Sequence, residues 1–118
     1  MILRVLLGVV LVVITYMSLT PSEIIVVGND KVGHLIAYSV LMFNAGLVFF
    51  KPTKHFIGAI IFCLIYGGLI EVFQHYIPGR FMSGYDLIAN ASGVGVGVVL
   101  TYFLYNPIIR TLQSTRII

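Results

Sequence analysis

Four long apolar segments, separated by short polar linkers, leave this chain few ways to fold. They cover residues 2–19, 32–50, 56–77 and 85–105, and each is close to the ~20 residues that an α-helix needs to cross a bilayer core of ~30 Å. The segments are apolar on every side, without the period of two of a membrane β-strand. An apolar segment in lipid satisfies its own backbone hydrogen bonds only as a helix. The sequence therefore predicts an all-α polytopic membrane protein, a four-transmembrane-helix bundle that forms one domain over residues 1–118.

The composition identifies lipid as the solvent of this bundle. The chain is 59% hydrophobic and 9% charged, whereas an average soluble domain is about 25% charged. A soluble domain of 118 residues buries only part of its surface and has no room for so much apolar area. Seven Lys and Arg residues without a basic run exclude a nucleic-acid surface. We therefore expect a multi-pass protein of the cell membrane whose main partner is the lipid bilayer, with a homo-oligomer compatible with this composition.

The first apolar segment needs a separate reading, because Arg4 followed by an apolar run resembles a secretory signal peptide. The run is followed by the residues Thr20, Pro21, Ser22 and Glu23, with no small-x-small cleavage pattern. We therefore predict that this segment is a retained first helix.

The basic residues predict how the bundle is oriented in the membrane. With four spans, both termini and the middle linker lie on one side, which holds Arg4, Lys51, Lys54, Arg110 and Arg116. The opposite side holds only Lys31 and Arg80. Because cytoplasmic loops carry the excess of Lys and Arg, we expect both termini in the cytoplasm. The linkers 20–30 and 78–84 then face outward.

Polar residues that are unusual in a membrane span gather near this outward side. They stand at helical spacings of three or four on three segments, so each set shares one helix face. The second segment carries Asp30, Lys31, His34 and Tyr38, the third Glu71, Gln74 and His75, the fourth Asp86 and Asn90, and Arg80 lies in the last linker. The sequence thus predicts one polar site formed by three helices at a common depth.

This set of residues favours a site for an anion. The second and fourth helices begin on the outward side, where their free N–H groups and positive dipole ends attract anions. Lys31 and Arg80 lie beside these ends. A carboxylate at the depth of Glu71, about 9 Å below the expected outer end of its helix at 1.5 Å per residue, costs several kcal/mol unless it is paired, protonated or hydrated. Glu71 and His34 are therefore our candidates for a catalytic acid or base.

Structural roles account for some of the same residues. Ser83 and Asp86 fit a capping box, Asn29 and Asp30 fit a helix N-cap, and Asn90 fits a hydrogen bond between helices. Lys31 and Arg80 fit a membrane boundary where long cations reach the headgroups.

A metal site is a further alternative, formed by His34, Glu71, His75 and Asp86. No HExxH or Cys-x-x-Cys pattern supports zinc at these positions. We therefore predict no metal and no cofactor.

Small residues on the fourth segment predict close helix packing. Ala89, Gly93 and Gly97 repeat every four residues, which lets another helix approach closely. We expect Gly67 and Gly68 on the third segment to form the facing surface.

The order and spacing of these polar residues resemble the VanZ-like family of membrane proteins over roughly residues 30–97. The matching positions are Asp30-Lys31-x-x-His34-x-x-x-Tyr38, Glu71-x-x-Gln74, Pro78-Gly79-Arg80 and Asp86-x-x-x-Asn90-x-x-Gly93-x-x-x-Gly97. His75 lies outside this pattern, and the first segment agrees only in being apolar and ending near a proline. The resemblance implies a bacterial membrane protein. The family is known through a member that lowers susceptibility to the glycopeptide antibiotic teicoplanin, but the resemblance transfers no catalytic residue.

Three functions remain open from the sequence. In the first, the protein binds an anionic lipid or a lipid-linked cell-wall precursor through Lys31, Arg80 and His34, supported by Asp30, Tyr38, Glu71, Gln74, Asp86 and Asn90. In the second, it is an intramembrane enzyme that uses Glu71 or His34 as acid or base on a lipid-linked substrate. In the third, it is a structural accessory to a partner membrane protein.

Overall fold

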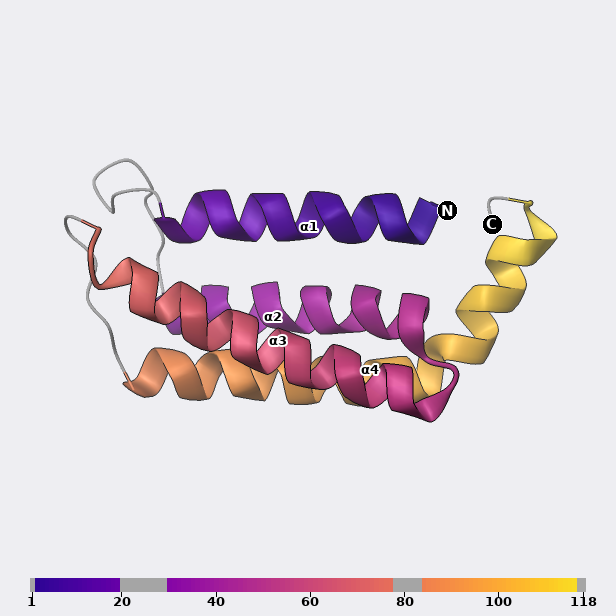
Figure 1. Cartoon of the computed structure of the whole chain (residues 1–118). Helices are drawn as coiled ribbons and strands as arrows, with labels where there is room; N and C mark the ends of the chain where they lie inside the picture. Colours follow the sequence, from indigo (N-terminus) through magenta and orange to yellow (C-terminus); the bar gives the residue numbers. More distant parts are fainter. Residues whose placement is uncertain (1, 20–29, 78–83, 117–118) are drawn as a thin grey trace.

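The computed structural model describes residues 2–19, 30–77 and 84–116, without the side chains of Asp30 and Lys31. It contains four helices, α1 (Ile2–Leu19), α2 (Asp30–Phe49), α3 (Thr53–Gln74) and α4 (Gly84–Ser114). The helices run lengthwise beside one another, and both chain ends lie at the same end of the molecule (Figure 1). The described residues contain no strand. The predicted all-α bundle with four spans is therefore confirmed, while the side of the membrane that holds the termini stays a prediction.

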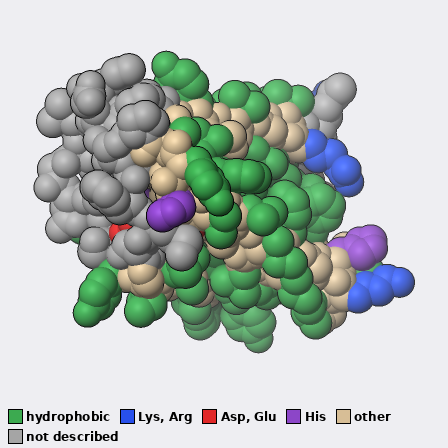
Figure 2. All heavy atoms as spheres, turned by 60° about the vertical axis from the view of Figure 1, so that its left-hand side comes forward, with side chains coloured by type: hydrophobic (Ala, Val, Ile, Leu, Met, Phe, Trp, Pro, Cys, Tyr) green, Lys and Arg blue, Asp and Glu red, His purple; other side chains and the backbone are tan. Residues whose placement is uncertain are grey.

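The outer surface of the bundle is suited to lipid. All four helices are long and apolar enough to cross a membrane. Large apolar side chains point outward along them, and more than half of the surface of Val12, Ile65 and Phe103 is exposed. Apolar side chains cover most of the described face in Figure 2, and the visible Lys and Arg side chains lie at the end away from the grey residues. A continuous apolar surface of this kind is stable only against lipid or another protein.

The closest helix pair in the bundle is α2 with α4, and two glycines of α4 allow it. A Cβ atom at Gly93 would lie 2.5 Å from the Leu35 carbonyl oxygen, and one at Gly97 would lie 2.6 Å from the Cβ atom of Met42. The predicted ridge of small residues on α4 is therefore present, but its partner is α2.

The expectation that Gly67 and Gly68 of α3 face this ridge is wrong. A Cβ atom at Gly68 would meet nothing within 4 Å, whereas one at Gly67 would meet Tyr38 and Asn90. The physical reason is the central position of α2. Within the apolar windows, 44% of α2 is buried, against 28% of both α3 and α4, so α2 takes the closest contact with α4.

Helix α1 is attached less tightly than the others. Among its described residues only Ile14 is buried, and it packs on α2 and α3 without reaching α4. Three neighbouring side chains donate hydrogen bonds to its backbone carbonyls. These are Asn44 Nδ2 to Leu3 O at 3.3 Å, the Tyr66 hydroxyl to Leu11 O at 3.2 Å, and Gln74 Nε2 to Ser18 O at 2.9 Å. Polar bonds of this kind are a normal means of holding helices together in lipid, where apolar association gains little.

Helix α4 continues beyond the expected end at Tyr105, through Pro107 to Ser114. Proline inside a helix removes one hydrogen bond and clashes with the carbonyl four residues earlier, which bends the helix without necessarily ending it. The Thr111 hydroxyl donates to the Pro107 carbonyl at 2.9 Å in the next turn. The last turns of α4 accordingly point away from the bundle axis (Figure 1).

Candidate functional site

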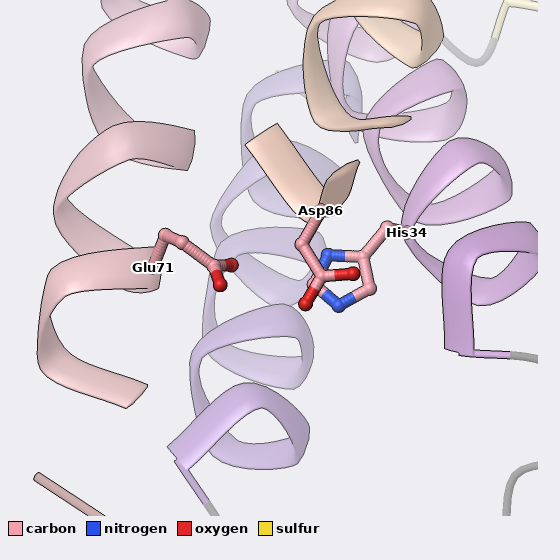
Figure 3. Close-up of side chains that lie close together, drawn as sticks. All are labelled: His34, Glu71 and Asp86. Atoms are coloured by element: carbon pink, nitrogen blue, oxygen red, sulfur yellow. The ribbon is translucent and has the colours of Figure 1, made fainter. Parts of the chain in front are cut away.

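Three ionisable side chains from three helices meet inside the bundle. His34 comes from α2, Glu71 from α3 and Asp86 from α4, and they are 8%, 0% and 5% exposed. One ligand atom from each, a ring nitrogen or a carboxylate oxygen, lies within 4.8 Å of the other two. Figure 3 shows the two carboxyl groups and the imidazole ring turned toward a common point. We call these three residues the buried triad.

The helix directions explain why the triad shares one depth. Helices α2 and α4 begin at the end where α3 stops. His34 lies four residues after the start of α2, or about 6 Å along the axis at 1.5 Å per residue. Glu71 lies three residues before the last residue of α3, or about 4.5 Å. The sequence predicted a depth of about 9 Å for Glu71, because it extended α3 to Ile77.

The His34 ring is oriented by Asn90 of α4. Its Nδ1 atom lies 2.7 Å from Asn90 Oδ1, and Asn90 Nδ2 donates to the Gly67 carbonyl of α3 at 3.4 Å. An amide oxygen only accepts, so His34 Nδ1 carries the proton and donates it, and in the neutral ring Nε2 keeps its lone pair. Asn90 therefore links three helices and fixes the tautomer of His34, a role that goes beyond the predicted bond between helices.

Tyr38 lies on the inner side of this site and is 1% exposed. Its ring packs on the backbone at Gly67, where an added Cβ atom would lie 3.2 Å from Tyr38 Cε1. Glu71 and Tyr66 lie close enough to the hydroxyl to interact with it electrostatically. Within the described residues the hydroxyl has no hydrogen-bond partner. Because a buried hydroxyl normally finds a partner, this group is available to a ligand bound beside Glu71.

The remaining predicted residues divide between those placed elsewhere and those outside the described part. The amide nitrogen of Gln74 fastens α1 through the Ser18 carbonyl. His75 is exposed beyond the end of α3, with its ring 5.4 Å from that of Tyr76, so it is not part of the buried triad. The side chains of Asp30 and Lys31, and all of Ser83 and Arg80, lie outside the described residues.

Sequence reasoning missed one component, the Gly67 carbonyl. It accepts the hydrogen bond from Asn90 Nδ2, and glycine at this position leaves room for the Tyr38 ring, whose Cε1 atom would lie 3.2 Å from an added Cβ atom. The signal in the sequence was the glycine pair, but a pair on a helix does not tell which member faces inward. Asp86 was predicted either to cap α4 or to form the site, and its place in the first turn of α4 within the triad makes it part of the site.

The electrostatics of the triad demand a compensating positive charge. Two carboxylates that are at most 5% exposed lie within 4.8 Å of one another. Burial and mutual repulsion both disfavour two negative charges in such a place, and the surrounding lipid raises the cost further. Two negative charges at this place therefore require a proton or a positive group close to them.

The chain can now be compared with known protein families. The family model described as VanZ/LLP1 matches residues 3–105, which include all four predicted spans. The chain belongs to the VanZ/LLP1 family. The resemblance predicted from the motif is thereby confirmed, and the buried triad of this VanZ/LLP1 protein lies within the matched region. Comparisons with curated proteins and with solved structures find no match.

Proposed function

We propose that this VanZ/LLP1 protein binds the anionic head group of a lipid or of a lipid-linked cell-wall precursor in the outer half of the cell membrane. The observation that carries the proposal is the convergence of His34, Glu71 and Asp86 in the interior, within about two helical turns of the helix ends. Ionisable residues inside a membrane are rare and costly, and they usually mark a ligand or ion site. Their position near the helix ends puts them within reach of a lipid head group.

The roles of the residues follow from their charges. Glu71 and Asp86 repel an anion, so they act by holding positive groups that contact it. Lys31 and Arg80 are those groups in the sequence, and the start of α2 adds the positive end of its helix dipole. Asn90 orients His34, which donates to or accepts from the head group. Asp30, Tyr38 and Gln74 complete the surrounding shell in this proposal.

The tautomer of His34 favours a second candidate function, acid–base chemistry on a lipid-linked envelope substrate. With Nδ1 bonded to Asn90, Nε2 is the atom that carries the lone pair of the neutral ring, and oxygen atoms of two carboxyl groups lie within 4.8 Å of one another. Such a group, held in one tautomer, can take up a proton from a reacting hydroxyl or water. Glu71 or His34 would be the base, and the triad would keep the proton inside the protein.

The proposal connects this chain to teicoplanin through the family resemblance. Teicoplanin carries a fatty acyl chain and acts near the membrane surface. A protein that binds or alters outer-leaflet precursors is expected to lower susceptibility to it. The structural-accessory hypothesis makes a different prediction, because a bundle that only supports a partner tolerates changes in its polar residues but not in the ridge of Ala89, Gly93 and Gly97.

The experiment measures teicoplanin susceptibility in a sensitive Gram-positive host that carries empty vector, the wild-type chain, Glu71→Gln or Tyr76→Phe. Tyr76 is 76% exposed near the same end of α3, so its variant is the matched control. Membrane abundance is quantified for each chain. We expect the wild type and Tyr76→Phe to protect, and Glu71→Gln to fail at equal abundance. Equal protection by Glu71→Gln would remove the triad from the function.

A direct binding measurement accompanies the susceptibility assay. Purified protein in nanodiscs of phosphatidylcholine, with and without phosphatidylglycerol, is examined by native mass spectrometry for retained anionic lipid. We expect retention that depends on Glu71 and is unchanged in Tyr76→Phe. Retention of the neutral and the anionic lipid to the same extent would contradict a site for an anionic head group.

A further inference from the structure

The donor atoms of the buried triad are arranged as a set of metal ligands. One imidazole nitrogen and two carboxylate oxygens, from His34, Glu71 and Asp86, lie within 4.8 Å of one another. Zinc binds such atoms at ~2.0–2.2 Å, so neighbouring donors around one tetrahedral ion lie roughly 3.4 Å apart. Small rotations of the two carboxyl groups close this difference, because both already point toward the imidazole ring (Figure 3).

The types of ligand favour a divalent ion at this point. Two carboxylate groups and an imidazole are ligands that divalent transition metals accept in proteins. Both carboxylates are at most 5% exposed, so water contributes little to their solvation. A bound ion turns the mutual repulsion of Glu71 and Asp86 into attraction by a shared charge.

The surroundings of His34 match those of a metal-bound histidine. Such a histidine usually donates its second ring N–H to an oxygen of the protein, which orients the ring and makes the free nitrogen a better ligand. His34 Nδ1 has this partner in Asn90 Oδ1 at 2.7 Å, so Nε2 is the ring nitrogen that would coordinate the ion.

An independent observation comes from Tyr38. Its hydroxyl is buried, has Glu71 as an electrostatic neighbour, and finds no hydrogen-bond partner in the described part of the chain. A hydroxyl at this place can donate to a metal-bound carboxylate or to a water molecule on the ion. The orphaned donor thus lies on the side of the triad where a bound ion would bring an acceptor.

We propose that His34, Glu71 and Asp86 bind one divalent transition-metal ion, with zinc as the best fit to one imidazole and two carboxylates. Three protein ligands leave one position of a tetrahedral site open, as in catalytic zinc sites. The sequence predicted no metal because it has no HExxH or Cys-x-x-Cys pattern. A site with one ligand from each of three helices produces no local motif, which explains why a pattern search misses it.

This inference deepens the proposed function, since the open position would receive an anionic oxygen of the head group, but it is tested separately. The full chain is purified in detergent, incubated with zinc, passed through a desalting column and analysed for metal by mass spectrometry. Cobalt replaces zinc in a parallel sample, because its visible absorption reports the coordination. We expect one zinc per chain and a cobalt spectrum of four or five ligands, both abolished in Asp86→Asn and Glu71→Gln.

His75→Gln is the matched control, because His75 is an exposed histidine near the same end of the bundle. Each variant is checked for helical content and a monodisperse elution. Failure of folded wild-type protein to retain zinc, manganese or iron overturns the metal site, as does equal retention by the triad variants. Loss of metal in His75→Gln alone also overturns it.

The outcomes distinguish the proposed metal site from the proposed lipid binding. Lipid retention is measured before and after EDTA treatment of the same preparation. Retention that depends on Glu71 in metal-free protein would keep the proposed function and contradict the placing of the head group on the ion. Stoichiometric zinc without preference for anionic lipid would support the metal site and contradict the proposed function.

Discussion

The two halves of the α2–α4 interface are built on different principles. In the half that contains Gly97 and Gly46, backbone and side chains touch directly, and a Cβ atom at Gly46 would lie 2.4 Å from the Thr101 hydroxyl oxygen. In the half that contains His34 and Asn90, the same two helices are joined by a polar bond beside two buried carboxyl groups. The first half stabilises the bundle by packing, whereas the second places charge where lipid makes it costly. The comparison teaches that one helix pair combines close packing with buried polar groups, and that the polar groups gather toward one end of it.

The largest expected effect comes from breaking the packed half with Gly97→Leu. The first added carbon alone would lie 2.6 Å from Met42 Cβ and 2.8 Å from the Ser39 carbonyl oxygen, so α2 and α4 must move apart. Overpacking of this kind typically costs about 1–3 kcal/mol, and more where backbone must shift. Unfolding of the purified protein by SDS in mixed micelles measures the loss. Gly68→Leu is the control, since a Cβ atom there meets nothing within 4 Å, and equal losses in both variants would contradict the close contact.

Glu71→Gln tests the polar half and should separate function from stability. The amide keeps the size and shape of the buried side chain, so we expect the free energy of unfolding to stay within about 1 kcal/mol of the wild type. Affinity for anionic lipid should fall at least tenfold, by analogy with the loss of a buried charged partner. The two quantities are measured on one preparation. A parallel fall in both would show that Glu71 belongs to the packing of the bundle.

Asn90→Ala should lower both the stability of the bundle and its affinity for zinc, because Asn90 links the helices and also orients His34. The variant loses the bonds to His34 and to the Gly67 carbonyl, and we expect about 1–3 kcal/mol of lost stability. Zinc affinity should fall about 10–100-fold through the loss of His34 orientation. A competition titration with a fluorescent chelator measures the affinity. Ser92→Ala, at an exposed position of α4, is expected to match the wild type in both measurements.

Tyr38→Phe should have the smallest effect on stability, and it tests whether Tyr38 belongs to the packed half or to the polar half of the interface. In metal-free protein we expect a change of stability within about 1 kcal/mol, since the hydroxyl bonds to no described residue. In the zinc-loaded protein we expect the free energy of unfolding to fall by about 1 kcal/mol, because the hydroxyl then has an acceptor whose hydrogen bond the variant loses. A large loss in the metal-free protein alone would assign Tyr38 to the packed half.

The sequence was sufficient for the helices and for the end of the bundle at which the site lies, although it placed Glu71 too deep. Apolar length fixes where a helix crosses lipid, and spacings of three and four fix which residues share a face, so His34, Glu71 and Asp86 were placed at one end of the bundle. It did not give the rotation of each helix about its axis. That rotation decides that Asp86 joins the triad while Gln74 turns to α1, and it depends on packing across helices that a single sequence does not display.

Two of the wrong expectations have different origins. The ridge of Gly93 and Gly97 was assigned to α3 because α3 also has glycines, but a small residue shows only that another segment approaches, without identifying that segment. The end of α4 was placed at Tyr105 because Pro107 is unfavourable inside a helix, and the helix accommodates it by bending.

The attachment of α1 has a consequence for which parts of this chain can change. The three acceptors on α1 are the carbonyl oxygens of Leu3, Leu11 and Ser18, at intervals that return to one stripe of the helix. Every amino acid offers the same carbonyl, so at these three points the docking of α1 depends on the donors Asn44, Tyr66 and Gln74 of its neighbours. The side chains of α1 add their own contacts at Ile14, which is buried, and at Thr15, whose hydroxyl is hydrogen-bonded to that of Tyr66. Outside these two positions, we expect α1 to tolerate exchange of one apolar residue for another.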